Sequence, residues 1–161
     1  MQTKEAIARE WLACLLRTYP GQSAGFLAAE QDPFRNPVGH TFHEALGTLL
    51  DELMADMHTG RVRAALGSMV QIRAVQDATP AQALEFLFQL KPILRRQAAG
   101  PDLDHLYTRI DQMALMAFDL YMQYRERTYA ARTNEARRRI FVLERRFGPL
   151  EAAACQPEGT S

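Results

Sequence analysis

Three polar side chains that could bind a ligand lie in one short stretch, residues 72–79. Arg73, Gln76 and Asp77 stand between two strongly apolar segments, where polar groups are costly unless they are paired. The Arg73 guanidinium and the Asp77 carboxylate are spaced i, i+4 and can bond on one helix face, beside the Gln76 amide. The pattern favours a structural network that fixes a corner between two helices. The polar wall of a ligand pocket is the alternative.

Side chains for catalysis or metal binding form no recognisable motif. No serine stands in a G-x-S-x-G context and no glycine-rich phosphate loop occurs, so we predict no catalytic residues and no enzyme. None of the histidines belongs to an HExxH or Cys/His arrangement, so we expect no metal site. His43 borders an apolar stripe and is a candidate haem ligand, but a surface role is favoured and no cofactor is predicted. The histidines are His40, His43, His58 and His105.

Length and composition bound the class of protein. A chain of 161 residues fits one domain with its own core. Nineteen basic residues balance nineteen acidic ones, so nothing global argues for nucleic acid or an anionic membrane as a partner. No apolar run is long enough for a membrane span or a signal peptide. Cys14 and Cys155 form no disulfide framework, so we predict a cytoplasmic protein.

Helical periodicity accounts for the chain, and no strand-period alternation occurs. Thr79, Pro80 and Gln82 form a capping box at the start of the fifth helix. That helix is apolar on nearly every side and therefore belongs in the middle of a bundle. We predict an all-α, single-domain bundle of about six helices. The expected helices cover 3–18, 22–30, 41–57, 61–76, 80–96 and 103–147.

Between the second and third expected helices, the segment DPFRNPVGH (32–40) has two prolines, a glycine, an Asp and an Asn in nine positions. Such a composition predicts a loop. The apolar side chains of Phe34 and Val38 predict that this loop is anchored on the core. Phe26 and Leu27, on the preceding helix, are expected to be buried.

The last expected helix has no glycine or proline from 103 to 147 and changes character near Tyr124. Before that residue, Leu, Met and aromatic side chains predict packing in the bundle. After it, eight arginines face three glutamates, and a heptad seam follows with spacings of 4, 3, 4, 3 and 4. The seam consists of Tyr129, Thr133, Ala136, Ile140, Leu143 and Phe147.

This seam would be marginal alone but is reasonable where a bundle helix pairs with a second chain, so we predict a homodimer. The arginines could contact phosphate. A solvated face with Glu135 and Arg139 paired at i, i+4 is favoured instead, so nucleic acid is not an expected partner. The predicted domain covers 1–148, and residues 149–161 are expected to be disordered.

Three stretches together resemble the N-terminal domain of RsbRD-type proteins, the RsbT co-antagonist family of bacterial stress signalling. They are DPFRNPVG (32–39), IRAVQDATPAQALEFLFQLK (72–91) and YRERTYAARTNEARR (124–138). The middle block is the most specific. The resemblance covers about residues 5–145 and departs at Ala78, where an aromatic residue is expected.

The resemblance implies a helical sensory or regulatory module with a protein partner in a signalling pathway. Such modules usually precede a phosphorylatable STAS domain, for which a chain ending at Ser161 has no room, so a stand-alone copy is expected. Related RsbR N-terminal domains are globin-like dimers without haem, which makes a globin-like bundle an expectation here. The alternative function is a small-molecule or haem sensor with a pocket near Arg73, Gln76 and Asp77.

Overall fold

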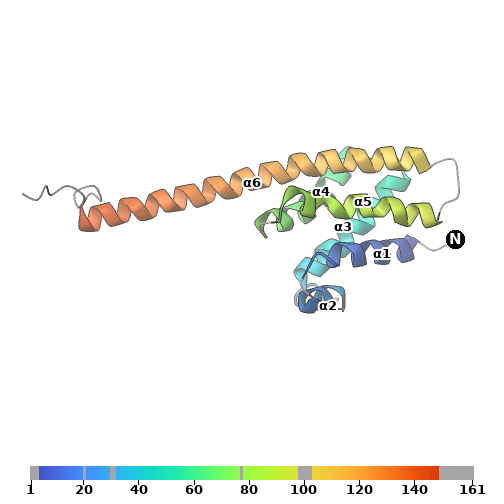
Figure 1. Cartoon of the computed structure of the whole chain (residues 1–161), viewed down its shortest axis with the longest axis horizontal. Helices are drawn as coiled ribbons and strands as arrows, with labels where there is room; N and C mark the ends of the chain where they lie inside the picture. Colours follow the sequence, from blue (N-terminus) through green and yellow to red (C-terminus); the bar gives the residue numbers. More distant parts are fainter. Residues whose placement is uncertain (1–3, 20, 30–31, 77, 98–102, 149–161) are drawn as a thin grey trace, which may run out of the picture. The chain divides into compact units, whose positions relative to one another are not determined.

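The computed structural model describes residues 4–19, 21–29, 32–76, 78–97 and 103–148, and this part of the chain holds six helices and no strand (Figure 1). The predicted all-α class and the number of helices are confirmed. The segment 149–161, with Cys155, lies outside the described residues. The helices are α1 (Lys4–Leu16), α2 (Gly21–Ala29), α3 (Pro37–Met54), α4 (Thr59–Val75), α5 (Pro80–Gln97) and α6 (Leu103–Phe147).

The chain divides into two compact units, residues 1–125 and 126–161. The first unit contains α1 to α5 and the beginning of α6, and the second contains the rest of α6. None of the described helices is long and apolar enough to cross a membrane.

The boundaries of α3 differ from those predicted. The helix begins at Pro37 rather than at residue 41 because Asn36 caps it: the Asn36 Oδ1 accepts the Gly39 N–H at 2.8 Å. Proline at the first helical position suits this start, since its missing N–H would have no partner inside the helix. The helix ends at Met54 rather than at residue 57, because the backbone of Ala55, with φ −106° and ψ −133°, leaves helical geometry. Met57 then has a positive φ of 54°.

A polar side chain, rather than an aromatic one, anchors the segment between α2 and α3. Phe34 is 96% exposed and Phe26 is also exposed, so the predicted burial of both rings is wrong. Asn36 is buried instead, and its Nδ2 donates to the Leu27 carbonyl oxygen at 3.1 Å. Leu27 and Val38 are partly buried against the core, as predicted.

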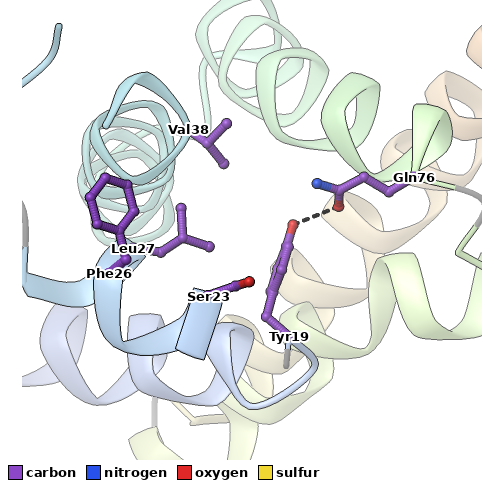
Figure 2. A pocket seen from close by; sticks show the side chains of 6 residues that line it. All are labelled: Tyr19, Ser23, Phe26, Leu27, Val38 and Gln76. Atoms are coloured by element: carbon purple, nitrogen blue, oxygen red, sulfur yellow. Dashed lines mark hydrogen bonds between the residues drawn. The ribbon is translucent and has the colours of Figure 1, made fainter. Parts of the chain in front are cut away.

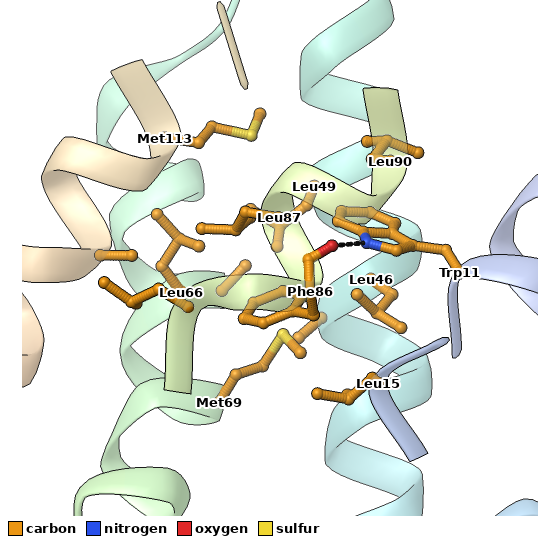
Figure 3. Packing of buried hydrophobic residues seen from close by; sticks show 14 of the residues in the cluster. Trp11, Leu15, Leu46, Leu49, Leu66, Met69, Phe86, Leu87, Leu90 and Met113 are labelled. Atoms are coloured by element: carbon orange, nitrogen blue, oxygen red, sulfur yellow. Dashed lines mark hydrogen bonds between the residues drawn. The ribbon is translucent and has the colours of Figure 1, made fainter. Parts of the chain in front are cut away.

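The core of the first unit lies between α1, α3, α4, α5 and the beginning of α6 (Figure 3). The Trp11 indole N–H donates to the Phe86 carbonyl oxygen at 2.6 Å, and the two rings lie 6.0 Å apart, which ties α1 to α5. The large apolar side chains of α5 are buried, as expected for a helix in the middle of a bundle, except that of Phe88, which is exposed. The largest buried side chains include Trp11, Phe42, Leu46, Leu49, Leu66, Met69, Leu87 and Leu90.

The beginning of α6 is held to α3 and α5 by side-chain hydrogen bonds. Arg109 donates to the Leu53 carbonyl oxygen at 2.7 Å, near the C-terminal end of α3, where a cation is favourable. Tyr107 donates to the Lys91 carbonyl oxygen at 3.2 Å, and Lys91 pairs with Asp111 at 2.6 Å. Three α6 side chains are completely buried here: Ile110, Met113 and Ala117.

Candidate functional site

The joint between α4 and α5 holds two of the three polar residues that the sequence analysis singled out. α4 ends at Val75 and α5 begins at Pro80. The Thr79 Oγ1 accepts the Gln82 N–H at 3.2 Å, and the Gln82 Oε1 accepts the Thr79 N–H at 3.0 Å. The predicted capping box is therefore confirmed, and it fixes where α5 starts.

Arg73, in the last turn of α4, is only 4% exposed. Its Nη2 donates to the Gln82 carbonyl oxygen at 2.8 Å, and its guanidinium lies 4.9 Å from the centre of the Tyr19 ring. Its Nε–H, which is also buried, has no hydrogen-bond partner among the described residues. Asp77 lies outside the described residues, so the predicted Arg73–Asp77 pair stays a prediction.

Tyr19 completes this site, and the sequence analysis missed it. The Tyr19 hydroxyl donates to the Gln76 Oε1 at 2.8 Å (Figure 2), while the ring stacks on Arg73. Tyr19 follows the end of α1, and the sequence pattern there indicates only where a helix stops. No spacing rule relates positions 19 and 76, so only the fold brings them together.

Two hollows meet at the Tyr19–Gln76 hydrogen bond, because both residues line both of them. One, of about 470 Å³, has the apolar side chains of Phe26, Leu27 and Val38 in its wall (Figure 2). The other, of about 490 Å³, is more polar. It is lined by Thr18, Tyr19, Arg73, Gln76, Ala78, Gln82 and Glu85.

α6 contacts both sides of the α4–α5 joint. The Tyr121 hydroxyl donates to the Ala78 carbonyl oxygen, and Arg125 donates to the Ala74 carbonyl oxygen at 3.2 Å. Neither contact was predicted. Both use backbone acceptors, which any residue supplies, so neither contact depends on the side chain at position 74 or 78.

In the second unit, the predicted seam on α6 is exposed along its whole length. Ile140 and Leu143 are each 47% exposed, and Phe147 more so. The ion pair between Glu135 and Arg139 is confirmed. Phe141 and Val142, which lie outside the seam, are exposed as well. Together with Ile140 and Leu143 they form a run of four consecutive exposed apolar residues, which the sequence analysis did not single out.

In the first unit, α6 also has an exposed apolar face where the sequence predicted packing in the bundle. Leu115 is 69% exposed, and Phe118 and Met122 are exposed as well. They are spaced three and four apart, so they lie on one side of the helix. The prediction fails here because hydrophobic residues surround this part of α6, whereas the core takes up only one face.

The histidines lie apart from both hollows. His43 is exposed on α3, and His58 precedes the first residue of α4. His40 approaches Glu44 in the next turn, with 3.4 Å between Nε2 and Oε1. Across the described ranges, no three His, Cys, Asp or Glu side chains gather in a way that could hold a metal ion.

Comparison with known proteins gives one match. The sequence model of the family described as "RsbT co-antagonist protein rsbRD N-terminal domain" matches residues 5–136, which is most of the chain. No curated protein and no solved structure matches, so the expected globin-like arrangement stays a prediction. The matched range includes the blocks at 32–39 and 72–91 and most of the block at 124–138. This chain therefore belongs to the RsbRD N-terminal domain family, a family of regulatory signalling domains.

Proposed function

We propose that the chain is a non-catalytic regulatory module that works as a homodimer and binds a protein partner through α6. Membership of a regulatory signalling family supports the regulatory role. The observation that carries the pairing is the exposure of Ile140, Leu143 and Phe147 at heptad spacing on one helix. Apolar side chains in such a stripe gain free energy when a second helix covers them.

The composition of the seam sets the strength of this pairing. Burying a large aliphatic side chain completely contributes about 1.5–3 kcal/mol, and Ile140 and Leu143, each 47% exposed, have only part of their surface left to bury. Thr133 and Ala136 add little apolar surface. The seam therefore supports a reversible dimer rather than a permanent one, which suits a regulatory module.

A gain of affinity tests the seam directly. Replacing Ala136, a seam position, with leucine adds apolar surface to each helix and should tighten the dimer at least about tenfold. Ala131→Leu is the matched control, since Ala131 is exposed on the same helix but outside the seam. Sedimentation equilibrium at micromolar concentration measures both dissociation constants.

A loss of affinity completes the test. Leu143→Asp places a charge in the seam and should shift the protein to monomers, because an unpaired charge is costly to bury. Circular dichroism checks that the variant keeps its helices. A wild-type protein that stays strictly monomeric in light scattering at micromolar concentration would contradict the proposal.

A second candidate function is a small-molecule sensor with its pocket at the α4–α5 joint. The buried Arg73 Nε–H without a partner favours it, because a buried donor left unpaired is normally satisfied by a ligand or a water molecule. The contacts of Tyr121 and Arg125 with the joint give α6 a means to respond to such a ligand. Native mass spectrometry of the protein purified from its own cell tests whether a small molecule is retained.

A further inference from the structure

Several hydrogen-bond donors line the polar hollow at the α4–α5 joint. Arg73 is buried, its Nη2 is used by the Gln82 carbonyl oxygen, and its Nε–H remains without a described partner. The Gln76 Oε1 accepts the Tyr19 hydroxyl, which leaves the two N–H groups of the same amide as donors. Gln82, in the first turn of α5, also lines this hollow, where the helix dipole is positive. Donors of this kind select an anion.

The charges of the hollow disfavour an anion with two negative charges. Glu85 lines the same space as Arg73, and its carboxylate repels a second negative charge. Dicarboxylates carry that second charge, and so does part of the phosphate near neutral pH, whereas a monocarboxylate does not. A planar carboxylate also matches the planar guanidinium better than other anions of one charge.

The neighbouring hollow supplies room for an apolar group. It begins on the other side of the Tyr19–Gln76 hydrogen bond, and Phe26, Leu27 and Val38 line it (Figure 2). Phe26 is an exposed aromatic ring that the core does not cover. Small-molecule sites commonly combine an apolar wall with a few convergent polar groups, and these two hollows together have that composition.

We propose that the α4–α5 joint binds a small monocarboxylate with an apolar body. Arg73 and Gln76 bind its carboxylate, and the Phe26, Leu27 and Val38 wall takes its apolar group. This inference rests on the second candidate function, the sensor, and is independent of dimer formation through α6.

The test uses the whole chain, ¹⁵N-labelled, with sodium hexanoate as the probe. Titration should shift the Arg73 Nε–H signal in the NMR spectrum, because the carboxylate binds the guanidinium group to which that hydrogen belongs. Acetate, butanoate and hexanoate should bind with rising affinity, by up to about fourfold for each buried CH₂ group. Hexanamide, which has the same shape without the charge, should bind at least about tenfold more weakly than hexanoate.

Variants separate the two halves of the site. Arg73→Gln should weaken hexanoate at least about tenfold, whereas Arg63→Gln, the same change at an exposed position of α4, should not. Phe26→Ala should reduce the gain from acetate to hexanoate without affecting acetate. Glu85→Gln should admit inorganic phosphate and succinate. Circular dichroism checks each fold, and the Phe26 and Glu85 variants keep the test decisive if Arg73→Gln does not fold.

Several results would overturn the inference. Equal binding of hexanoate and hexanamide would remove the role of the guanidinium. Tighter binding of phosphate than of hexanoate to the wild-type protein would exclude a monocarboxylate site. A site with a dissociation constant of about 1 mM is almost fully occupied at about 20 mM hexanoate. No shift of the Arg73 signal at that concentration would exclude the site itself. None of these results depends on whether the protein dimerises, which sedimentation equilibrium measures. The dimer proposal and the carboxylate proposal can therefore be rejected independently.

Discussion

Each of the three buried polar side chains in the described part of the chain lies at a different corner between successive helices. Asn36 donates to the end of α2 and caps α3. Glu52 accepts the His58 N–H at 2.9 Å, between α3 and α4. Arg73 reaches from α4 to the Gln82 carbonyl oxygen of α5. Because a buried polar group without its partner is costly, these residues fix the geometry of the corners as well as contributing to stability.

Gly39 belongs to the first of these corners, and the space around it explains the block at 32–39. A Cβ added there would lie 2.1 Å from the Asn36 Nδ2 and 2.5 Å from the Leu27 carbonyl oxygen. Gly39→Ala should therefore displace Asn36 and lower the free energy of unfolding by about 1–3 kcal/mol, the cost of leaving buried polar groups unpaired. Urea unfolding followed by circular dichroism measures the change.

Gly47→Ala is the matched control for Gly39→Ala. Both glycines belong to α3, but a Cβ at Gly47 meets nothing within 4 Å. Alanine should be neutral there or raise the stability by up to about 1 kcal/mol, as helix propensity predicts. Equal effects of the two substitutions would show that the Asn36 corner does not depend on the close approach at Gly39.

At the scale of the elements, the sequence predicts what is local and misses what is distant. The start of α5 follows from Thr79 and Gln82, three residues apart, and the Glu135–Arg139 ion pair follows from a spacing of four residues. The Tyr19–Gln76 hydrogen bond and the Tyr121 contact with Ala78 join residues 57 and 43 positions apart, and no local pattern encodes them. The predicted burial of Leu115, Phe118 and Met122 on α6 is wrong for the same reason. Only the packed bundle decides which face of an apolar helix is covered.

The capping box of α5 is worth testing as an element because it sets the position of the proposed site. Thr79→Ala removes the acceptor of the Gln82 N–H and should lower the free energy of unfolding by about 1 kcal/mol. Thr108→Ala is the control: Thr108 is exposed inside α6, and its hydroxyl only bonds the Asp104 carbonyl oxygen in the previous turn. Urea unfolding should show little change for Thr108→Ala. A Thr79→Ala variant as stable as the wild type would mean that tertiary packing alone fixes the start of α5.

At the scale of the whole molecule, a net charge of zero conceals a strong local asymmetry. The chain has nineteen basic and nineteen acidic residues, yet α6 after Tyr124 has eight arginines and three glutamates. A homodimer through the seam brings two such segments together.

We therefore expect added salt to tighten the dimer, since screening weakens the repulsion between the two copies. Sedimentation equilibrium at 50 and at 500 mM sodium chloride (Debye lengths of about 14 and 4 Å) should show a smaller dissociation constant at the higher concentration. Nucleic-acid binding through the same arginines would weaken steeply instead.

Two charge reversals distinguish pairing along the seam from a general effect of net charge. In a parallel pair, Arg137 flanks the seam and faces Arg132 of the second copy, whereas Arg138 points away from it. Arg137→Glu converts this repulsion into attraction and should tighten the dimer at low salt more than Arg138→Glu, although both change the net charge equally. It should also reduce the dependence on salt. Equal effects of the two variants would show that the copies do not pair in parallel along this seam. A wild-type dimer whose dissociation constant rises as salt is added would contradict an apolar seam flanked by like charges.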